Sequence, residues 1–177
     1  MKRLLSAFAC AVVLAALACG GTSPSAPSTP TFASVAGVWT GPVTQTGASA
    51  GPECLGLFQS GNGATERYTL SITQSGSNLN ATASSQSTGQ SCSYTGTAGS
   101  SSFSLTATVS SCNAIGYQTT CNGAARDVYL NARSVTGNVS GNSMTGTVGE
   151  SWNVFARGTT TNGLGIVNVS YGFTLTR

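Results

Sequence analysis

The sequence predicts an all-β domain: an eight-stranded antiparallel up-and-down meander that closes into a barrel, after a cleaved signal peptide and a flexible tether. Short segments in which apolar and polar residues alternate recur along the chain and are separated by tight turns, which is typical of consecutive antiparallel strands. No helical periodicity of useful length follows the N-terminal segment. Closure of the meander into a barrel would remove the exposed edges that an open sheet carries.

The N-terminal segment has the pattern of a secretory signal. Lys2 and Arg3 precede an apolar stretch, residues 4–18, that is short for a membrane span. The stretch ends in Ala-Leu-Ala directly before Cys19. These residues resemble a bacterial lipoprotein signal, which implies that Cys19 is acylated with palmitate or a similar chain and becomes the first residue of the mature protein. The alternative is ordinary secretion.

The segment after Cys19 is rich in Ser, Pro and Thr and carries no charge, a composition that cannot build a core. We therefore predict a signal peptide over residues 1–18, a lipidated cysteine and tether over residues 19–33, and the β-barrel domain over residues 34–177. Gly20, rather than an aspartate, follows the cysteine. The resemblance thus implies a lipid-anchored protein of the bacterial outer membrane, whereas a chain without acylation would be periplasmic or secreted.

The charge balance excludes nucleic acid as a partner. The chain has seven Lys and Arg against four Asp and Glu and no His, and Lys2 and Arg3 belong to the signal peptide. No basic patch remains. Alternating β-branched and aromatic residues also exclude a disordered chain. We expect a monomer that contacts a membrane through its acylated N-terminus.

The first five strands follow from the alternation of apolar residues. We place them at residues 35–46, 66–74, 78–85, 91–97 and 102–110. Their inward-facing side chains include Trp39, Val43, Tyr68, Leu70, Ile72, Leu79, Ala81, Tyr94, Phe103 and Leu105. The long connection at residues 47–65 carries Leu55, Leu57 and Phe58, which would cover one end of the barrel as a plug or as a lid. The last strand, at residues 166–177, alternates in the same way.

Strands six and seven form a hairpin over Val128–Val154. Its two-residue loop is Gly141-Asn142, and Gly at the first loop position is the signature of a type II′ turn. This loop predicts the facing pairs Val139 and Met144, Val135 and Val148, Arg133 and Glu150, Asn131 and Trp152, and Tyr129 and Val154. All of them would share one face, since a slip of one residue would turn the apolar set outward.

Arg133 and Glu150 interrupt the apolar face of this hairpin. Two opposite charges that face each other support the register, because a lone inward charge would be costly. One interpretation is structural: an ion pair near a rim, or a bulge that turns both residues outward. The other is functional: the polar element of an otherwise apolar pocket beside Trp152, where a few convergent polar groups orient a ligand.

The cysteines predict two disulfides. Once the signal is removed and Cys19 is acylated, the chain retains Cys54, Cys92, Cys112 and Cys121. An even number in an oxidising compartment is typical of a disulfide framework. Cys112 and Cys121 lie in one connection, residues 111–126, which favours a bond between them and leaves Cys54 to pair with Cys92. Four cysteines allow three pairings, so the other two stay open.

A short motif adds a resemblance. Gly37-Val38-Trp39 in the first strand, the meander of eight strands and Arg177 resemble the calycin superfamily, which includes lipocalins and avidin-like barrels. In lipocalins the tryptophan of such a motif packs at the closed end and a late arginine lies across it. The resemblance therefore implies structural roles for Trp39 and Arg177. It also implies that a small molecule could bind inside the barrel, although a fold does not fix a function.

The sequence offers no catalytic residues, no metal site and no cofactor site. The chain has no histidine, and the part after the signal has no lysine. Its four acidic residues are dispersed, and no Cys-x-x-Cys occurs. The usual general bases, metal ligands and paired carboxylates are thus missing from the pattern. We expect a protein that is not an enzyme.

Two classes of function stay open. In the first, the barrel of an envelope lipoprotein binds a small apolar or amphipathic molecule. The candidate ligand-binding residues are Arg133, Glu150, Trp152, Tyr129, Tyr94, Phe103 and Tyr171. In the second, the barrel is a filled structural or interaction module displayed on the cell envelope. The interior volume separates the two classes, because many inward Ala and Gly residues leave space for a ligand or for neighbouring aromatic rings.

Overall fold

The computed structural model describes residues 31–50, 54–113 and 115–177. The predicted signal peptide, the acylation site Cys19 and most of the tether lie outside the described residues. The described elements are β1 (Gly37–Ala50), α1 (Leu55–Gln59), β2 (Thr65–Ser75), β3 (Asn78–Ser85), β4 (Ser91–Ala98), β5 (Ser102–Ala107), the 3-10 turn η1 (Val109–Ser111), β6 (Gly116–Cys121), β7 (Ala124–Ser140), β8 (Ser143–Ala156) and β9 (Gly165–Thr176). Within these ranges, no helix has the length and apolar character needed to cross a bilayer.

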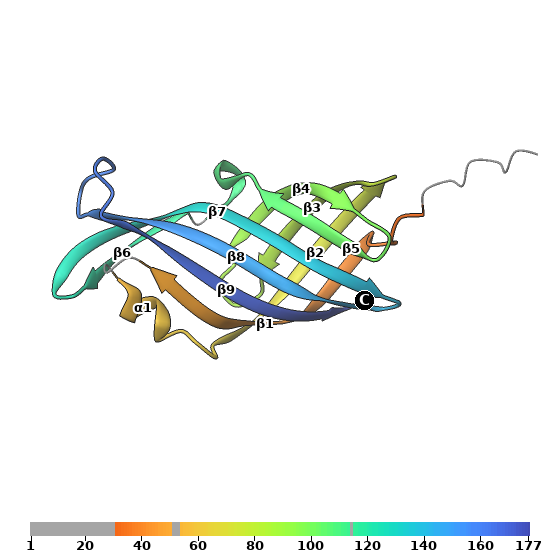
Figure 1. The fold of residues 1–177 in the computed structure, drawn as a ribbon, viewed down its shortest axis with the longest axis horizontal. Coiled ribbons are helices and arrows are strands. Elements are labelled where there is room, and N and C mark those ends of the chain that lie inside the picture. The colour runs from red at the N-terminus through yellow and green to blue at the C-terminus, as the bar shows by residue number, and fades with distance from the viewer. Residues whose placement is uncertain (1–30, 51–53, 114) are drawn as a thin grey trace, which may run out of the picture. The chain divides into compact units, whose positions relative to one another are not determined.

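Eight of the strands form a closed antiparallel barrel, which confirms the predicted fold class (Figure 1). Neighbouring strands follow the order β5-β4-β3-β2-β1-β9-β8-β7, and a pairing of β5 with β7 closes the ring. The ninth strand, β6, pairs with β7. Burial alternates along the barrel strands as the sequence pattern requires, so that in β5 Phe103, Leu105 and Ala107 are buried and the residues between them are exposed.

β6 was not expected from the alternation pattern. We assigned residues 111–126 to a connection, but β6 and the start of β7 lie within them. The two strands are joined by Asn122-Gly123, whose φ angles of 52° and 77° are both positive. That backbone is characteristic of a type I′ hairpin turn, for which Asn-Gly is the preferred sequence. This dipeptide was the available signal for the missed strand.

The β7–β8 hairpin has the predicted turn but only part of the predicted register. Gly141 has φ of 59°, and Val139 pairs with Met144 and Arg133 with Glu150. A β-bulge then shifts the pairing between Leu130 and Ala132, so Leu130, not Asn131, faces Trp152.

Because of the same bulge, the predicted pairing of Tyr129 with Val154 is also wrong. Val128, not Tyr129, faces Val154, and Tyr129 faces Asn153. The physical reason is burial: the extra residue exposes polar Asn131 and allows Val128 and Leu130 to be buried.

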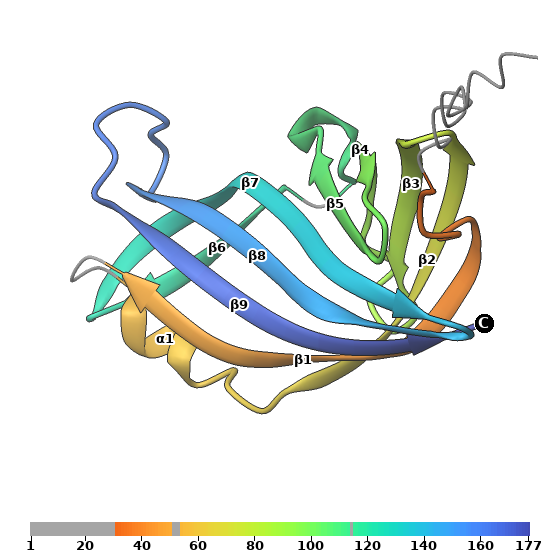
Figure 2. The same ribbon diagram turned by 45° about the vertical axis from the view of Figure 1, so that its right-hand side comes forward.

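The buried side chains form two clusters. The larger one fills the barrel and includes Trp39, Leu105 and Met144. The smaller one contains Val128, Val154, Val167, Val169 and the half-cystines Cys54 and Cys121. Figure 2 shows why there are two: the long strands β1, β7, β8 and β9 run past the short strands β3, β4 and β5 toward α1 and β6. The second cluster fills this extension.

Trp39 and Arg177 contact each other near the C-terminus, where the first and last strands of the barrel pair. Trp39 is fully buried, and its indole Nε1 donates a hydrogen bond of 2.8 Å to the Val35 carbonyl. The Arg177 guanidinium lies 4.5 Å from the centre of the Trp39 ring. Arg177 also donates to the Ala36 carbonyl at 2.9 Å, so it ties the last strand to the segment before the first.

Two disulfides are present, but the favoured pairing is wrong. The bonds join Cys54 to Cys121 and Cys92 to Cys112. The missed strand explains the error, because β6 carries Cys121 away from Cys112 to the hairpin end. There Cys121 meets Cys54, which precedes α1, while η1 leaves Cys112 beside β4 and Cys92.

Candidate functional site

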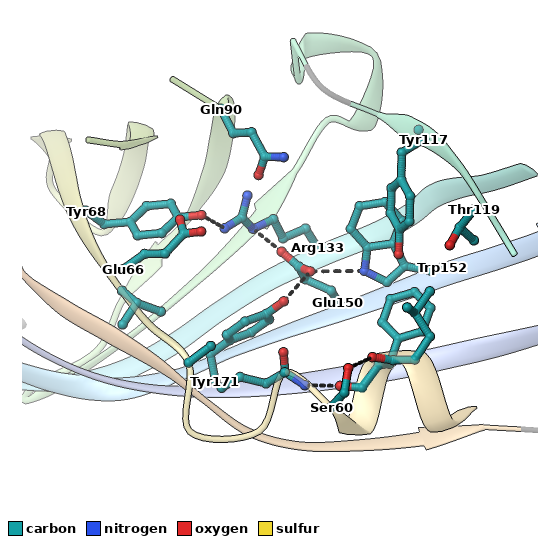
Figure 3. A pocket seen from close by; sticks show the side chains of 17 residues that line it. Ser60, Glu66, Tyr68, Gln90, Tyr117, Thr119, Arg133, Glu150, Trp152 and Tyr171 are labelled. Atoms are coloured by element: carbon teal, nitrogen blue, oxygen red, sulfur yellow. Dashed lines mark hydrogen bonds and ion pairs between the residues drawn. The ribbon is translucent and has the colours of Figure 1, made fainter. Parts of the chain in front are cut away.

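A cavity of about 430 Å³ lies between the two clusters of buried side chains. Its described lining comprises Val43, Gln45, Leu57, Phe58, Ser60, Gly61, Ala64, Glu66, Tyr68, Gln90, Gly116, Tyr117, Thr119, Arg133, Glu150, Trp152 and Tyr171. Trp152 and Tyr171 pack against both clusters and so form part of the boundary between them. Figure 3 shows the lining side chains converging from β1, β2, β6, β7, β8, β9 and the α1 segment. We call this cavity the pocket.

One wall of the pocket is the segment between β1 and β2, which includes α1. Gln45 holds it in place, since its Nε2 donates to the Phe58 carbonyl at 2.6 Å and to the Asn62 Oδ1 at 3.1 Å. The Cys54–Cys121 disulfide fixes the start of α1 to the end of β6. The segment therefore covers the pocket as a wall that is cross-linked on one side and hydrogen-bonded on the other.

Arg133 and Glu150 form a buried ion pair inside the pocket. The Arg133 Nε and Glu150 Oε1 atoms are 3.0 Å apart, and each side chain is 7% exposed. The second carboxylate oxygen, Glu150 Oε2, accepts hydrogen bonds from Trp152 Nε1 at 3.0 Å and from the Tyr171 hydroxyl at 3.1 Å. Glu150 is thus fully coordinated by three side chains from β7, β8 and β9 (Figure 3).

The terminal nitrogens of Arg133 have weaker partners. Nη2 lies 3.4 Å from the Tyr68 hydroxyl, and Nη1 lies 3.8 Å from the sulfur of Cys92. The Arg133 guanidinium carbon is 5.5 Å from the centre of the Tyr68 ring. These contacts are long for hydrogen bonds, so the terminal N–H groups retain donor capacity toward the pocket.

Arg133 and three tyrosines of the pocket keep one protonation state around neutral pH. Burial alone would lower the pKa of Arg133, but the Glu150 carboxylate and the nearby phenols outweigh it and raise that pKa. Burial raises the pKa of Tyr171, and the Glu150 charge raises it further. Burial likewise raises the pKa of Tyr68 and takes that of Tyr117 to about 12. Arg133 is therefore cationic and the three phenols are neutral.

Three aromatic rings line the pocket near its rim. The ring centres of Tyr117 and Trp152 are 5.7 Å apart, those of Phe58 and Trp152 are 6.3 Å apart, and those of Phe58 and Tyr117 are 6.4 Å apart. At these distances the rings pack on one another rather than enclosing a gap between them. These rings form an apolar wall of the pocket, whereas Arg133 and Glu150 form its polar floor.

Four of the predicted ligand-binding residues meet in the pocket: Arg133, Glu150, Trp152 and Tyr171. The other three do not line it. Tyr129 lies on the opposite side of β7 because of the bulge and packs on Phe155, with ring centres 6.0 Å apart. Tyr94 and Phe103 are buried in the barrel cluster.

Several pocket residues were not predicted from the sequence. Tyr117 belongs to the missed strand β6, and Ala64 belongs to the β1–β2 connection, where no periodicity indicates which side chains turn inward. Leu57 and Phe58 of the same connection, which we expected to cover one end of the barrel as a plug or as a lid, line the pocket. Glu66 begins the predicted strand at residues 66–74 and is in phase with the inward-facing Tyr68 and Leu70, but it was considered only as one of four dispersed acids. The Asn-Gly turn after Cys121 was the one signal that would have found Tyr117.

The hydroxyl of Tyr94 is unusual within the barrel. It is buried and has no hydrogen-bond partner among the described residues. Burial raises the pKa of Tyr94 to about 12, while the Arg133 charge acts in the opposite direction. Its phenol therefore stays neutral and unpaired in the apolar interior.

The described residues contain no cluster of His, Cys, Asp and Glu side chains that could hold a metal ion. Comparison of the chain with protein-family models, with curated proteins and with solved structures found no match.

Proposed function

We propose that this barrel binds a small amphipathic molecule in the pocket, and that the protein does so without catalysis, as a lipoprotein of the bacterial outer membrane. The observation that carries the proposal is the pocket itself, an aromatic-walled cavity with a buried ion pair at its floor. A filled structural barrel has no need of such a cavity.

The size and chemistry of the pocket support this proposal. A volume of about 430 Å³ lies within the range of roughly 300–1,000 Å³ that is typical of small-molecule sites. Such sites combine an apolar lining with a few polar groups that fix the orientation of the ligand. The apolar lining is supplied here by Phe58, Tyr117 and Trp152, and the orienting polar groups are those of Arg133 and Tyr68.

An uncharged fluorescent dye tests whether the pocket binds ligands. N-phenyl-naphthylamine becomes emissive in apolar surroundings, so we expect saturable enhancement with the wild-type protein. Ala64→Phe should abolish it, because Ala64 lines the pocket and a phenyl ring there would occupy space that the dye needs.

The matched control for this test is Ser71→Phe, which places the same ring on the exposed outer face of β2. It should bind the dye as the wild type does. Equal enhancement in both variants would place dye binding outside the pocket and contradict the proposal.

The membrane anchor is a separate part of the proposal and rests on the sequence of residues 1–20. If Cys19 is acylated, Cys19→Ser should move the protein from the membrane fraction to the soluble fraction. Unchanged fractionation would contradict a lipid anchor. We also propose a calycin-type relationship, which the contact between Arg177 and Trp39 supports.

A specific observation favours the second function class, an interaction module. Large apolar side chains are exposed on α1, on β6 and just before it, and around the start of β9: Leu57, Ile115, Tyr117, Leu164 and Ile166. These elements lie at the end of the barrel opposite the C-terminus (Figure 1). Exposed apolar groups that cluster in this way can form a contact surface for another molecule.

A further inference from the structure

The pocket carries one negative charge in excess. Its described lining contains two carboxylates, Glu66 and Glu150, and a single cation, Arg133. Arg133 and Glu150 compensate each other at 3.0 Å. Glu66 has no basic partner among the described residues, and its half-buried side chain borders the pocket. A ligand that enters the pocket therefore meets a carboxylate that has no ion-pair partner among the described residues.

Two groups in the pocket have unused hydrogen-bonding capacity of opposite kinds. The terminal nitrogens of Arg133 are donors whose protein contacts are long, at 3.4 Å to Tyr68 and 3.8 Å to Cys92. Glu66 is an acceptor: its Oε2 accepts from the Ser85 hydroxyl at 2.8 Å, and its Oε1 has no hydrogen bond within the described structure. Glu150, by contrast, uses both of its oxygens.

The donor and the acceptor both lie near Tyr68. Tyr68 contacts Arg133, and the charges of Arg133 and Glu66 both act on the Tyr68 phenol. Figure 3 shows the Glu66 carboxylate, the Tyr68 hydroxyl and the Arg133 guanidinium grouped on one side of the pocket, away from the Trp152 and Tyr117 rings. A polar head group placed there would face both groups while an apolar tail lies against the rings.

We propose that the pocket selects an uncharged amphiphile whose head group both accepts and donates a hydrogen bond, an alcohol or a primary amide, and that it discriminates against carboxylates. The head group accepts from Arg133 and donates to Glu66. This inference rests on the proposed ligand-binding function and specifies the chemistry of the ligand.

The alternatives for the head group are disfavoured on physical grounds. A carboxylate would be removed from water beside Glu66, while Arg133, the one cation in the described lining, is already paired with Glu150. A quaternary ammonium group offers no acceptor to Arg133, and the rings of Phe58, Tyr117 and Trp152 pack on one another instead of enclosing a cation.

Calorimetric titration of the full chain with four ligands of equal tail length tests this selectivity. The ligands are octanol, octanamide, octanoate and octyltrimethylammonium. We expect octanol and octanamide to bind, and octanoate to bind more weakly by at least about tenfold because of the unpaired Glu66 charge. Octyltrimethylammonium should bind more weakly than octanamide. Tighter binding of either charged ligand than of octanamide would overturn the proposal.

A pair of variants assigns the selectivity to Glu66. Glu66→Gln keeps an acceptor for Ser85 and removes the charge, so octanoate binding should strengthen until it approaches that of octanamide. Arg67→Gln removes the charge of the adjacent residue, whose exposed side chain points outward. It should leave the ratio of the octanoate affinity to the octanamide affinity unchanged. If Glu66→Gln does not change the ratio of the octanoate affinity to the octanamide affinity, the proposal is also overturned.

The outcomes separate this inference from the function on which it rests. If all four ligands bind with equal affinity, the pocket binds amphiphiles but does not select the head group. If none of the four binds while the dye is also not bound, both the ligand-binding function and the selectivity are contradicted.

Discussion

The buried Arg133–Glu150 pair joins β7 to β8 at the floor of the pocket, and Tyr171 adds a hydrogen bond from β9. Removing one partner leaves the other charge buried without compensation, which costs about 3–5 kcal/mol. We expect Arg133→Met and Glu150→Gln each to lower the free energy of unfolding by this order. The double variant should lose less than the two single losses combined, by at least about 1 kcal/mol.

Urea denaturation of the four proteins of this cycle measures the coupling. Arg67→Met, on the exposed face of β2, serves as the control and should combine additively with Glu150→Gln. If the losses in the free energy of unfolding of Arg133→Met and Glu150→Gln were also additive, the two side chains would have no coupling energy, which would contradict the prediction.

Two tyrosines of the barrel should respond differently to loss of their hydroxyl groups. The buried Tyr94 hydroxyl has no partner among the described residues, so Tyr94→Phe removes an unsatisfied polar group and should leave stability unchanged or raise it by about 1 kcal/mol. Tyr171→Phe removes the hydrogen bond to Glu150 and should destabilise by about 1–3 kcal/mol. Thermal denaturation compares them, and a larger loss for Tyr94→Phe would mean that its hydroxyl has a partner.

Tyr94 also predicts how stability changes at high pH. Its pKa is raised by burial from 10.0 to about 12, so the folded state favours the protonated phenol. The stabilisation is complete below pH 10 and is lost as the pH rises toward 12, by at most about 2–3 kcal/mol. Tyr94→Phe should make this alkaline loss smaller when unfolding is measured across that range. An unchanged pH profile would show that Tyr94 does not contribute to it.

At the scale of elements, close approach of the strands requires glycine at particular positions of β8. A Cβ at Gly146 would collide with the Thr136 carbonyl oxygen and lie 2.6 Å from the Cα of Gly137, and backbone atoms cannot move aside cheaply. At Gly149, in the same strand, the nearest atom would be the Ser134 hydroxyl at 3.4 Å. We expect Gly146→Ala to lower the melting temperature by several degrees and Gly149→Ala to change it little. Similar losses for both would show that packing at Gly146 is not the cause.

The two disulfides should contribute unequally to stability. Cys54 and Cys121 are separated by 67 positions and Cys92 and Cys112 by 20. The longer loop constrains the unfolded chain more, so we expect Cys54→Ala/Cys121→Ala to cost about 4 kcal/mol and Cys92→Ala/Cys112→Ala about 3 kcal/mol on the loop-entropy model. Chemical denaturation of the two double variants measures the difference, and a larger loss at the shorter loop would contradict this ranking.

The strands of the barrel were predictable because their burial has a strict period of two and their turns have specific residues. The Gly141-Asn142 turn, for example, fixes the pairing of Val139 with Met144. The bulge near Asn131 was not predictable, because alternation alone gives no reason to interrupt the register. It arises from the benefit of burying Val128 in the smaller cluster and Leu130 in the larger one, which depends on tertiary packing.

At the scale of the whole molecule, the pocket exists because the barrel strands differ in length. β1, β7, β8 and β9 extend beyond β3, β4 and β5, and the extension carries its own cluster of buried side chains. The ion pair was predictable from two opposite charges at facing positions of one hairpin. The sequence indicated that the β1–β2 connection covers one end of the barrel, but not where it is fixed, and it did not indicate β6, because both depend on the Cys54–Cys121 bond and on contacts between distant segments.

The central claim is that the pocket binds a small molecule in the cell. Native mass spectrometry of the protein recovered from its own cells tests it most directly, with Ala64→Phe as the blocked variant and Ser71→Phe as the control. We predict a bound small-molecule mass on the wild type and on Ser71→Phe that is absent from Ala64→Phe. Identical spectra for all three proteins, with no added mass or with the same added mass, would contradict the claim.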